Sequence, residues 1–130
     1  MTLLNDIKAA LVASGNFEHV SASTLIPVRK FPAVIVEPSK PVMDQDETGE
    51  VSLDSIGFDV SVICKFEANS VIEDTYDATL AQLDDRVDNV RSVLFAQKQG
   101  IRYSNELISA VEIQGIKCLL WQFEAELIVK

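Results

Sequence analysis

The residues most suited to chemistry in this chain form a short acidic segment, residues 44 to 50, with the sequence Asp-Gln-Asp-Glu-Thr-Gly-Glu. Alternating carboxylates followed by a glycine are typical of an EF-hand calcium loop. Four positions of that loop are matched here, by Asp44, Asp46, Thr48 and Gly49. The position that should supply a bidentate glutamate holds Ser55, and prolines upstream exclude the entering helix. We therefore expect a polar hairpin tip and no metal.

The remaining reactive side chains lack partners at catalytic or metal-binding spacing. His19 is the only histidine and no G-x-S-x-G nucleophile turn occurs. A zinc site would need His19, Cys64 and Cys118 to converge, whereas Cys64 falls in an apolar strand pattern typical of a buried thiol. Asp88 and Arg91 are spaced to pair across one helical turn. The sequence thus predicts no catalytic residue, no metal and no cofactor, and hence a protein that is not an enzyme.

The polar face of the long predicted helix carries further carboxylates among Gln82, Arg86 and Asn89. Paired carboxylates can perform acid–base chemistry, but a solvated or subunit-facing helix surface explains these adequately. They are Asp77, Asp84, Asp85 and Asp88.

Composition narrows the class of protein further. The 130 residues, 48% of them hydrophobic, suit a single domain over residues 1 to 130 with one core. The net charge is −9, and Arg29-Lys30 is the only adjacent basic pair, so direct nucleic-acid binding is not expected. The chain shows no signal peptide and no apolar stretch long enough to span a membrane. We expect a product of the cytoplasm with reduced thiols.

The hydrophobic periodicity predicts an α+β fold, with an antiparallel or mixed sheet packed on one long helix and a short N-terminal helix. The short helix covers about residues 2 to 14, and the long helix runs from Asp74 to about Gln97 with Phe95 widening its apolar stripe. Strands are predicted in this order: a short one at 17 to 20, then 33 to 37, 56 to 66, 107 to 113 and 119 to 129. Residues 115 to 117 would join the last two as a hairpin.

Some apolar residues fall on strand faces that the alternation assigns to solvent. They are Ile63, Ile108, Leu120 and Ile128. Such residues suggest that another subunit covers part of this face. Sheet edges and the hairpin around residues 44 to 55 are then the expected contacts, because edge strands present unpaired backbone groups. The predicted interaction residues are Asp44, Asp46, Glu47, Thr48, Gly49 and Glu50.

The order of elements resembles that of the small tail-terminator and tail-completion proteins of long-tailed bacteriophages, the group of the lambda-type minor tail protein U. The resemblance rests on the short helix Leu3 to Ala13, the proline-flanked strand Phe31 to Pro38, a polar hairpin, the long strand Ile56 to Phe66, the long helix, and a closing hairpin that ends in Trp121 to Val129. It covers essentially the whole chain as a layout, and it carries over no individual functional residue.

The resemblance implies a structural role in the virion neck or tail. Such proteins form homo-oligomeric rings, typically hexameric, that cap the tail tube and present a surface to the head-connector proteins. Head-completion and connector proteins of the same neck region share this layout and stay an alternative. A small-ligand-binding regulatory α+β domain, with a pocket between helix and sheet, is a second alternative from a different class, and an enzyme that uses carboxylates is a third.

Overall fold

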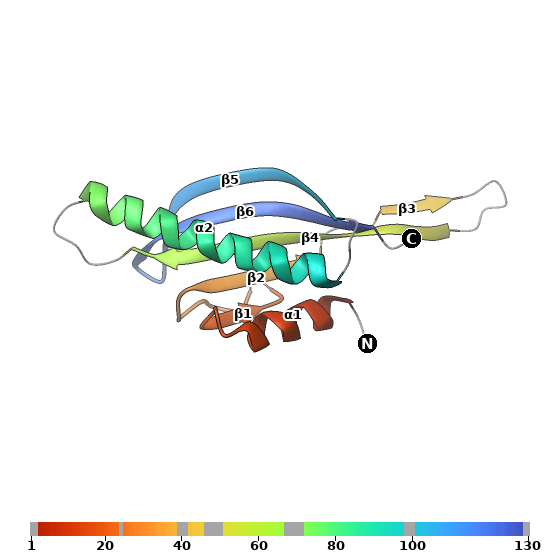
Figure 1. Cartoon of the computed structure of the whole chain (residues 1–130), viewed down its shortest axis with the longest axis horizontal. Helices are drawn as coiled ribbons and strands as arrows, with labels where there is room; N and C mark the ends of the chain where they lie inside the picture. Colours follow the sequence, from red (N-terminus) through yellow and green to blue (C-terminus); the bar gives the residue numbers. More distant parts are fainter. Residues whose placement is uncertain are drawn as a thin grey trace.

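The computed structural model describes residues 3–23, 25–38, 42–45, 51–66, 72–97 and 101–128. In these residues two helices pack on one face of a mixed β-sheet, which confirms the expected α+β class (Figure 1). Neither helix has, in its described residues, an apolar stretch of the length that a bilayer requires.

The sheet is organised around its longest strand, β4 (Val51–Lys65). The strand order is β1-β2-β4-β6-β5, and β3 pairs with the first part of β4. Only β1 and β2 are parallel, and every other described pair is antiparallel. The other strands are β1 (His19–Ser21), β2 (Ala33–Pro38), β3 (Val42–Gln45), β5 (Ile101–Ile113) and β6 (Ile116–Ile128).

The main core lies between the sheet and the helices α1 (Leu3–Ser14) and α2 (Ile72–Gln97). Side chains on a helix meet on one face at spacings of three and four, and alternate strand residues share one face of a sheet. Both patterns are realised here. The buried helix residues are Ile7, Leu11, Leu83, Val87, Val90 and Leu94, and the strand residues that face them include Val34, Val36, Phe58, Val60, Val62 and Phe123. Burying each Leu or Phe contributes about 1.5–3 kcal/mol.

The opposite face of the sheet is covered in part by the chain itself. Ile63 is only 3% exposed and belongs to a second buried cluster with Ala33, Ile35, Cys118 and Val28, the last from the segment between β1 and β2. The expectation that another subunit covers Ile63 is therefore wrong. Leu120 packs, partly buried, against the same cluster. The side chain of Ile128 lies outside the described residues, and Ile108 is considered with its strand below.

Several element boundaries differ from the sequence prediction. Strand β4 begins at Val51, β5 at Ile101 and β6 at Ile116, all earlier than expected, and α2 begins at Ile72. The β5–β6 turn is made by Gln114 and Gly115 rather than by residues 115 to 117. Both turn residues have positive φ, 53° and 78°, as a two-residue hairpin turn that matches the twist of the strands requires.

One helix prediction also fails. Phe95 was expected to widen the buried stripe of α2, yet its side chain is 59% exposed. It follows Leu94 by about 100° around the helix, which turns its ring away from the sheet.

Candidate assembly surfaces

Strand β3, which contains the first predicted interaction residue, Asp44, lies at one end of the sheet. Strand β3 pairs with β4 in the register Asp44 with Ser52, while β2 pairs only with the part of β4 from Phe58 to Ile63. The β3–β4 ladder therefore projects beyond the body of the sheet (Figure 1). The backbone of Asp44 is in this ladder. Other predicted interaction residues lie outside the described residues, namely Asp46, Glu47, Thr48, Gly49 and Glu50.

Strand β5 forms one border of the sheet, because it pairs with β6 alone among the described strands. Its ladder shifts register between Ser104 and Leu107, where Asn105 adopts a left-handed φ of 55°. This bulge leaves Leu107 57% exposed and Ile108 39% exposed. Successive side chains of a strand point to opposite faces, so apolar groups flank this edge on both sides. The edge thus offers unpaired backbone groups together with apolar surface.

Arg91 of α2 fixes the β5 edge to the helix layer. The central carbon of its guanidinium lies 5.0 Å from the ring centre of Tyr103, 5.3 Å from that of Phe123 and 5.8 Å from that of Trp121. The guanidinium also forms an ion pair with Glu106 in the bulge. Cation–π contacts of this kind contribute roughly 0.5–2 kcal/mol.

This arrangement corrects the sequence interpretation of Arg91, which pairs with Glu106 rather than with Asp88. Burial raises the pKa of the Tyr103 hydroxyl, and the positive charge of Arg91 partly opposes that rise. Sequence spacing gave no signal for these contacts, because the partners of Arg91 come from two strands that follow the helix.

Carboxylates line up across the open face of the sheet, which is the face opposite the helices. Glu37 pairs in register with Asp59, which pairs in turn with Glu124. Like charges directly opposite one another in a sheet are destabilising. The pKa of Asp59 is raised, first by burial of its carboxyl group and then by the charges of Glu124 and Glu37. Among the described residues no group of side chains is arranged to hold a metal ion. The row places three acidic side chains side by side on this face.

Glu124 has a structural role in this row. Its carboxylate accepts hydrogen bonds from Ser104 Oγ, at 3.4 Å, and from Asn105 Nδ2. Both donors belong to the bulge of β5. The same carboxylate that repels its neighbours therefore also stabilises the shape of the edge strand.

The cysteines and the histidine do not form a reactive centre. Cys64 lies in the main core and Cys118 in the second cluster, on opposite faces of the sheet. Burial raises the pKa of the Cys64 thiol to about 11, with Arg86 opposing the shift, and burial also raises the pKa of Cys118. Burial lowers the pKa of His19, as does the charge of Lys8. Neither thiol is activated as a nucleophile, because the thiolate is the reactive form.

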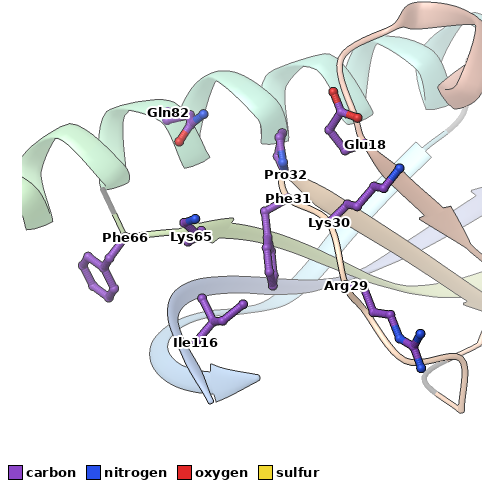
Figure 2. A pocket seen from close by; sticks show the side chains of 9 residues that line it. All are labelled: Glu18, Arg29, Lys30, Phe31, Pro32, Lys65, Phe66, Gln82 and Ile116. Atoms are coloured by element: carbon purple, nitrogen blue, oxygen red, sulfur yellow. The ribbon is translucent and has the colours of Figure 1, made fainter. Parts of the chain in front are cut away.

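A cavity of about 630 Å³ opens at the end of the sheet away from the β3–β4 ladder (Figure 2). Lys30 and Lys65 reach it from segments far apart in the sequence, and Arg29 also belongs to its lining. The chain therefore has a group of cations that the sequence, with its single adjacent basic pair, did not indicate. The other lining residues are Glu18, Phe31, Pro32, Phe66, Gln82 and Ile116.

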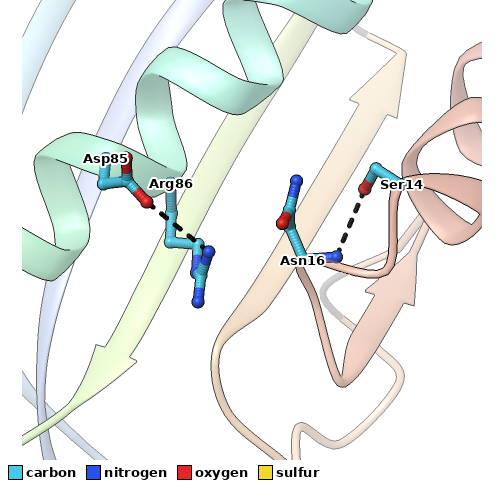
Figure 3. A network of polar contacts seen from close by, with 4 residues as sticks. All are labelled: Ser14, Asn16, Asp85 and Arg86. Carbon is cyan, nitrogen blue, oxygen red and sulfur yellow. Dashed lines mark hydrogen bonds and ion pairs between the residues drawn. The ribbon is translucent and has the colours of Figure 1, made fainter.

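Arg86 lies one helical turn beyond Gln82 on α2. Its guanidinium extends from α2 toward Asn16, in the loop after α1, and lies 3.6 Å from the carboxylate of Asp85 (Figure 3). The backbone N–H of Asn16 donates to Ser14 Oγ, which closes the end of α1. Arg86 is not among the residues that line the cavity.

Comparison with known protein families and with curated proteins finds no match to this chain.

Proposed function

We propose that this chain is a structural subunit of a bacteriophage neck or tail, a tail terminator that forms a ring, caps the tail tube and joins it to the head. The observation that carries the proposal is the exposed edge of β5, with apolar side chains on both of its faces. An edge of this kind is a docking site for another β-strand or another chain.

The β5 edge is long, and side chains of α2 and β6 contact its bulge. It runs over 13 residues, and the contacts of Arg91 and Glu124 fix the bulge at its centre. In a free monomer the apolar surface of Leu107 and Ile108 stays exposed to water. Each Å² of it raises the free energy by about 25 cal/mol relative to its buried state. Contact with a neighbouring chain would remove that cost and pair the free backbone groups. A preformed edge also lowers the entropy that association loses.

The charge of the molecule is consistent with the proposed location. The net charge is −9, and the row of Glu37, Asp59 and Glu124 concentrates negative charge on the open face. A ring that presents such a surface to its lumen repels DNA and lets it pass without adhering. The α+β layout, with a long helix on one face of the sheet, is the fold that the sequence resemblance to tail terminators implies.

The rival functions gain less support. Buried apolar residues such as Leu83, Val87 and Phe123 fill the layer between helix and sheet. A small ligand would therefore have to bind in the cavity at the end of the sheet, whose lining includes Gln82 of α2 and Lys65 of β4. A head-completion or connector protein would use the same surfaces as a terminator. The two roles differ in the particle to which the subunit first binds.

The first test is the native mass of the purified chain, by light scattering on a sizing column at two salt concentrations. The proposal predicts a particle several times the 14.3 kDa of one chain. A monomer at every protein concentration would contradict it.

Gold-labelled protein is then mixed separately with headless tails and with tailless, DNA-filled heads. Label at tail ends supports a terminator, and label on heads only supports the head-completion role.

A further inference from the structure

The cavity at the end of the sheet has a charge opposite to that of the chain as a whole. In the described part of the chain, its lining contains the cationic side chains of Arg29, Lys30 and Lys65 and a single carboxylate, that of Glu18. The whole chain carries a net charge of −9. A concave site with an excess of one sign of charge concentrates ligands of the opposite sign. The cavity is therefore suited to an anion.

The cations of the lining are not neutralised by the described residues around them. Arg29, Lys30 and Lys65 form no ion pair with any of these residues. Lys30 precedes β2 and Lys65 ends β4, and these two strands are neighbours in the sheet, so both lysines reach one opening (Figure 2). Gln82 of α2 adds a side-chain amide, which can donate a hydrogen bond to a second ligand oxygen.

Apolar side chains form the rest of the wall. Phe31 and Ile116 lie close together in the cavity, and both pack, partly buried, against the second buried cluster (Figure 2). Phe66 packs against the main core, and its ring centre lies 6.3 Å from that of Tyr76. Aromatic side chains favour offset or edge contacts with other rings. The cavity thus places a partly aromatic surface beside its cations.

Backbone hydrogen bonds hold the walls of the cavity together. The N–H of Glu18 donates to the carbonyl of Pro32 at 2.9 Å, and the N–H of Phe66 donates to the carbonyl of Lys117 at 3.0 Å. These bonds join the segment before β1 to the start of β2, and the end of β4 to β6. The cavity is thus preformed, which reduces the entropy that binding would cost.

The size of the cavity suits a small molecule better than a polymer. Its volume of about 630 Å³ lies within the range of roughly 300–1,000 Å³ that is typical of ligand pockets. A nucleic acid needs cations along a groove that follows its backbone. Here the cations surround one opening, and Glu18 stands among them. Such a lining selects a ligand with one anionic group and an apolar body.

We propose that this cavity binds a small organic anion with an aromatic body, an aryl carboxylate or an aryl phosphate. Lys30 and Lys65 bind the anionic group, and Phe31 and Ile116 contact the ring. The inference goes beyond the proposed assembly function and does not depend on it, because the cavity lining includes no residue of β5.

Fluorescence titration with 8-anilinonaphthalene-1-sulfonate tests the proposal, because this probe is an aryl anion whose emission rises when it leaves water. N-phenyl-1-naphthylamine has the same ring system without the sulfonate and is the neutral reference. The test variant carries Lys30→Met and Lys65→Met, which remove both charges and keep unbranched apolar stems. Affinity for the anionic probe is expected to fall at least about tenfold, and affinity for the neutral probe less than about twofold. Circular dichroism first shows that the variant is folded.

Two control variants separate the cavity from the rest of the surface. Lys8→Met with Arg102→Met makes the same change in net charge away from the cavity. Phe95→Ser with Leu107→Ser removes apolar side chains that are 59% and 57% exposed elsewhere on the molecule. Both controls are expected to bind the two probes as the wild type does.

Competition identifies the anionic group. Benzoate and phenyl phosphate are expected to displace the anionic probe, and the stronger competitor shows which group the cavity prefers. Benzyl alcohol, which lacks the charge, and inorganic phosphate, which lacks the ring, are expected to leave the probe bound at the same concentration.

Several results would overturn the proposal. One is a wild type that binds no anionic probe, and another is a test variant that binds it unchanged or loses both probes equally. Loss of the anionic probe in either control would place its binding outside the cavity. Displacement by inorganic phosphate as strong as by phenyl phosphate would show that the apolar wall takes no part. Stronger displacement by an oligonucleotide or an acidic peptide would show that the cavity serves a macromolecule.

Discussion

Leu83→Ala tests the packing of α2 on the sheet, on which every surface described above depends. Leu83 is completely buried in the middle of the helix. The substitution removes three carbon groups, which costs about 2.4 kcal/mol at about 0.8 kcal/mol for each buried methylene. Strand β4, beneath the helix, is paired with β6 on one side and with β2 on the other. The sheet therefore cannot move fully into the space that the lost side chain leaves. With that cavity term we expect a loss of about 3–4 kcal/mol, a large share of the roughly 5–15 kcal/mol that stabilises a domain.

Urea denaturation measures this loss, with the fluorescence of Trp121, the only tryptophan, as the reporter. Phe95→Ala in the same helix is the matched control. Because Phe95 is 59% exposed, its truncation is expected to change the free energy of unfolding by less than about 0.5 kcal/mol, although it removes more atoms. A loss below about 0.5 kcal/mol for Leu83→Ala, or equal losses for both variants, would refute the register of the helix.

Three further predictions concern individual contacts. In a double-mutant cycle, Arg91→Met and Tyr103→Leu should show a coupling of about 0.5–2 kcal/mol, and strictly additive losses in urea denaturation would rule out the cation–π contact. The raised pKa of Asp59 means that the folded state holds this proton more tightly than the unfolded chain, so stability falls as pH rises through that pKa. Asp59→Asn should therefore raise the free energy of unfolding at pH 7 by about 0.2–1 kcal/mol and have little effect near pH 3, whereas parallel pH profiles would argue against the carboxylate row. With its pKa raised to about 11, the thiol of Cys64 should react with a disulfide reagent at pH 8 far more slowly in the native protein than in urea, and rapid native labelling would show that it is not buried.

The sequence predicted those parts of the fold in which periodicity reports burial. The alternation from Ile56 onward located the strand face that carries Phe58 and Val60, and the helical spacing placed Leu83 in the core. Phe95 misled the prediction because hydrophobicity alone does not distinguish an exposed ring from a buried one. The start of β5 was missed because the bulge at Asn105 interrupts the alternation of the strand.

Contacts between distant segments were beyond the reach of sequence patterns. Val28 lies in a proline-containing stretch without periodicity, yet it covers Ile63 on the open face of the sheet. Lys30 and Lys65 meet at one cavity only because β2 and β4 are neighbours in the sheet. The acidic character of residues 44 to 50 could be recognised from the sequence, whereas the place of β3 at one end of the sheet depends on its pairing with β4.

Electron microscopy of the purified, negatively stained protein tests the central claim most directly. The expected result is closed rings of uniform diameter with a central opening, formed by this chain without other proteins. Two-dimensional class averages give the number of subunits in each ring. Isolated monomers that persist at high protein concentration would contradict the proposal that this chain is a ring-forming subunit. Compact particles without an opening would contradict it too.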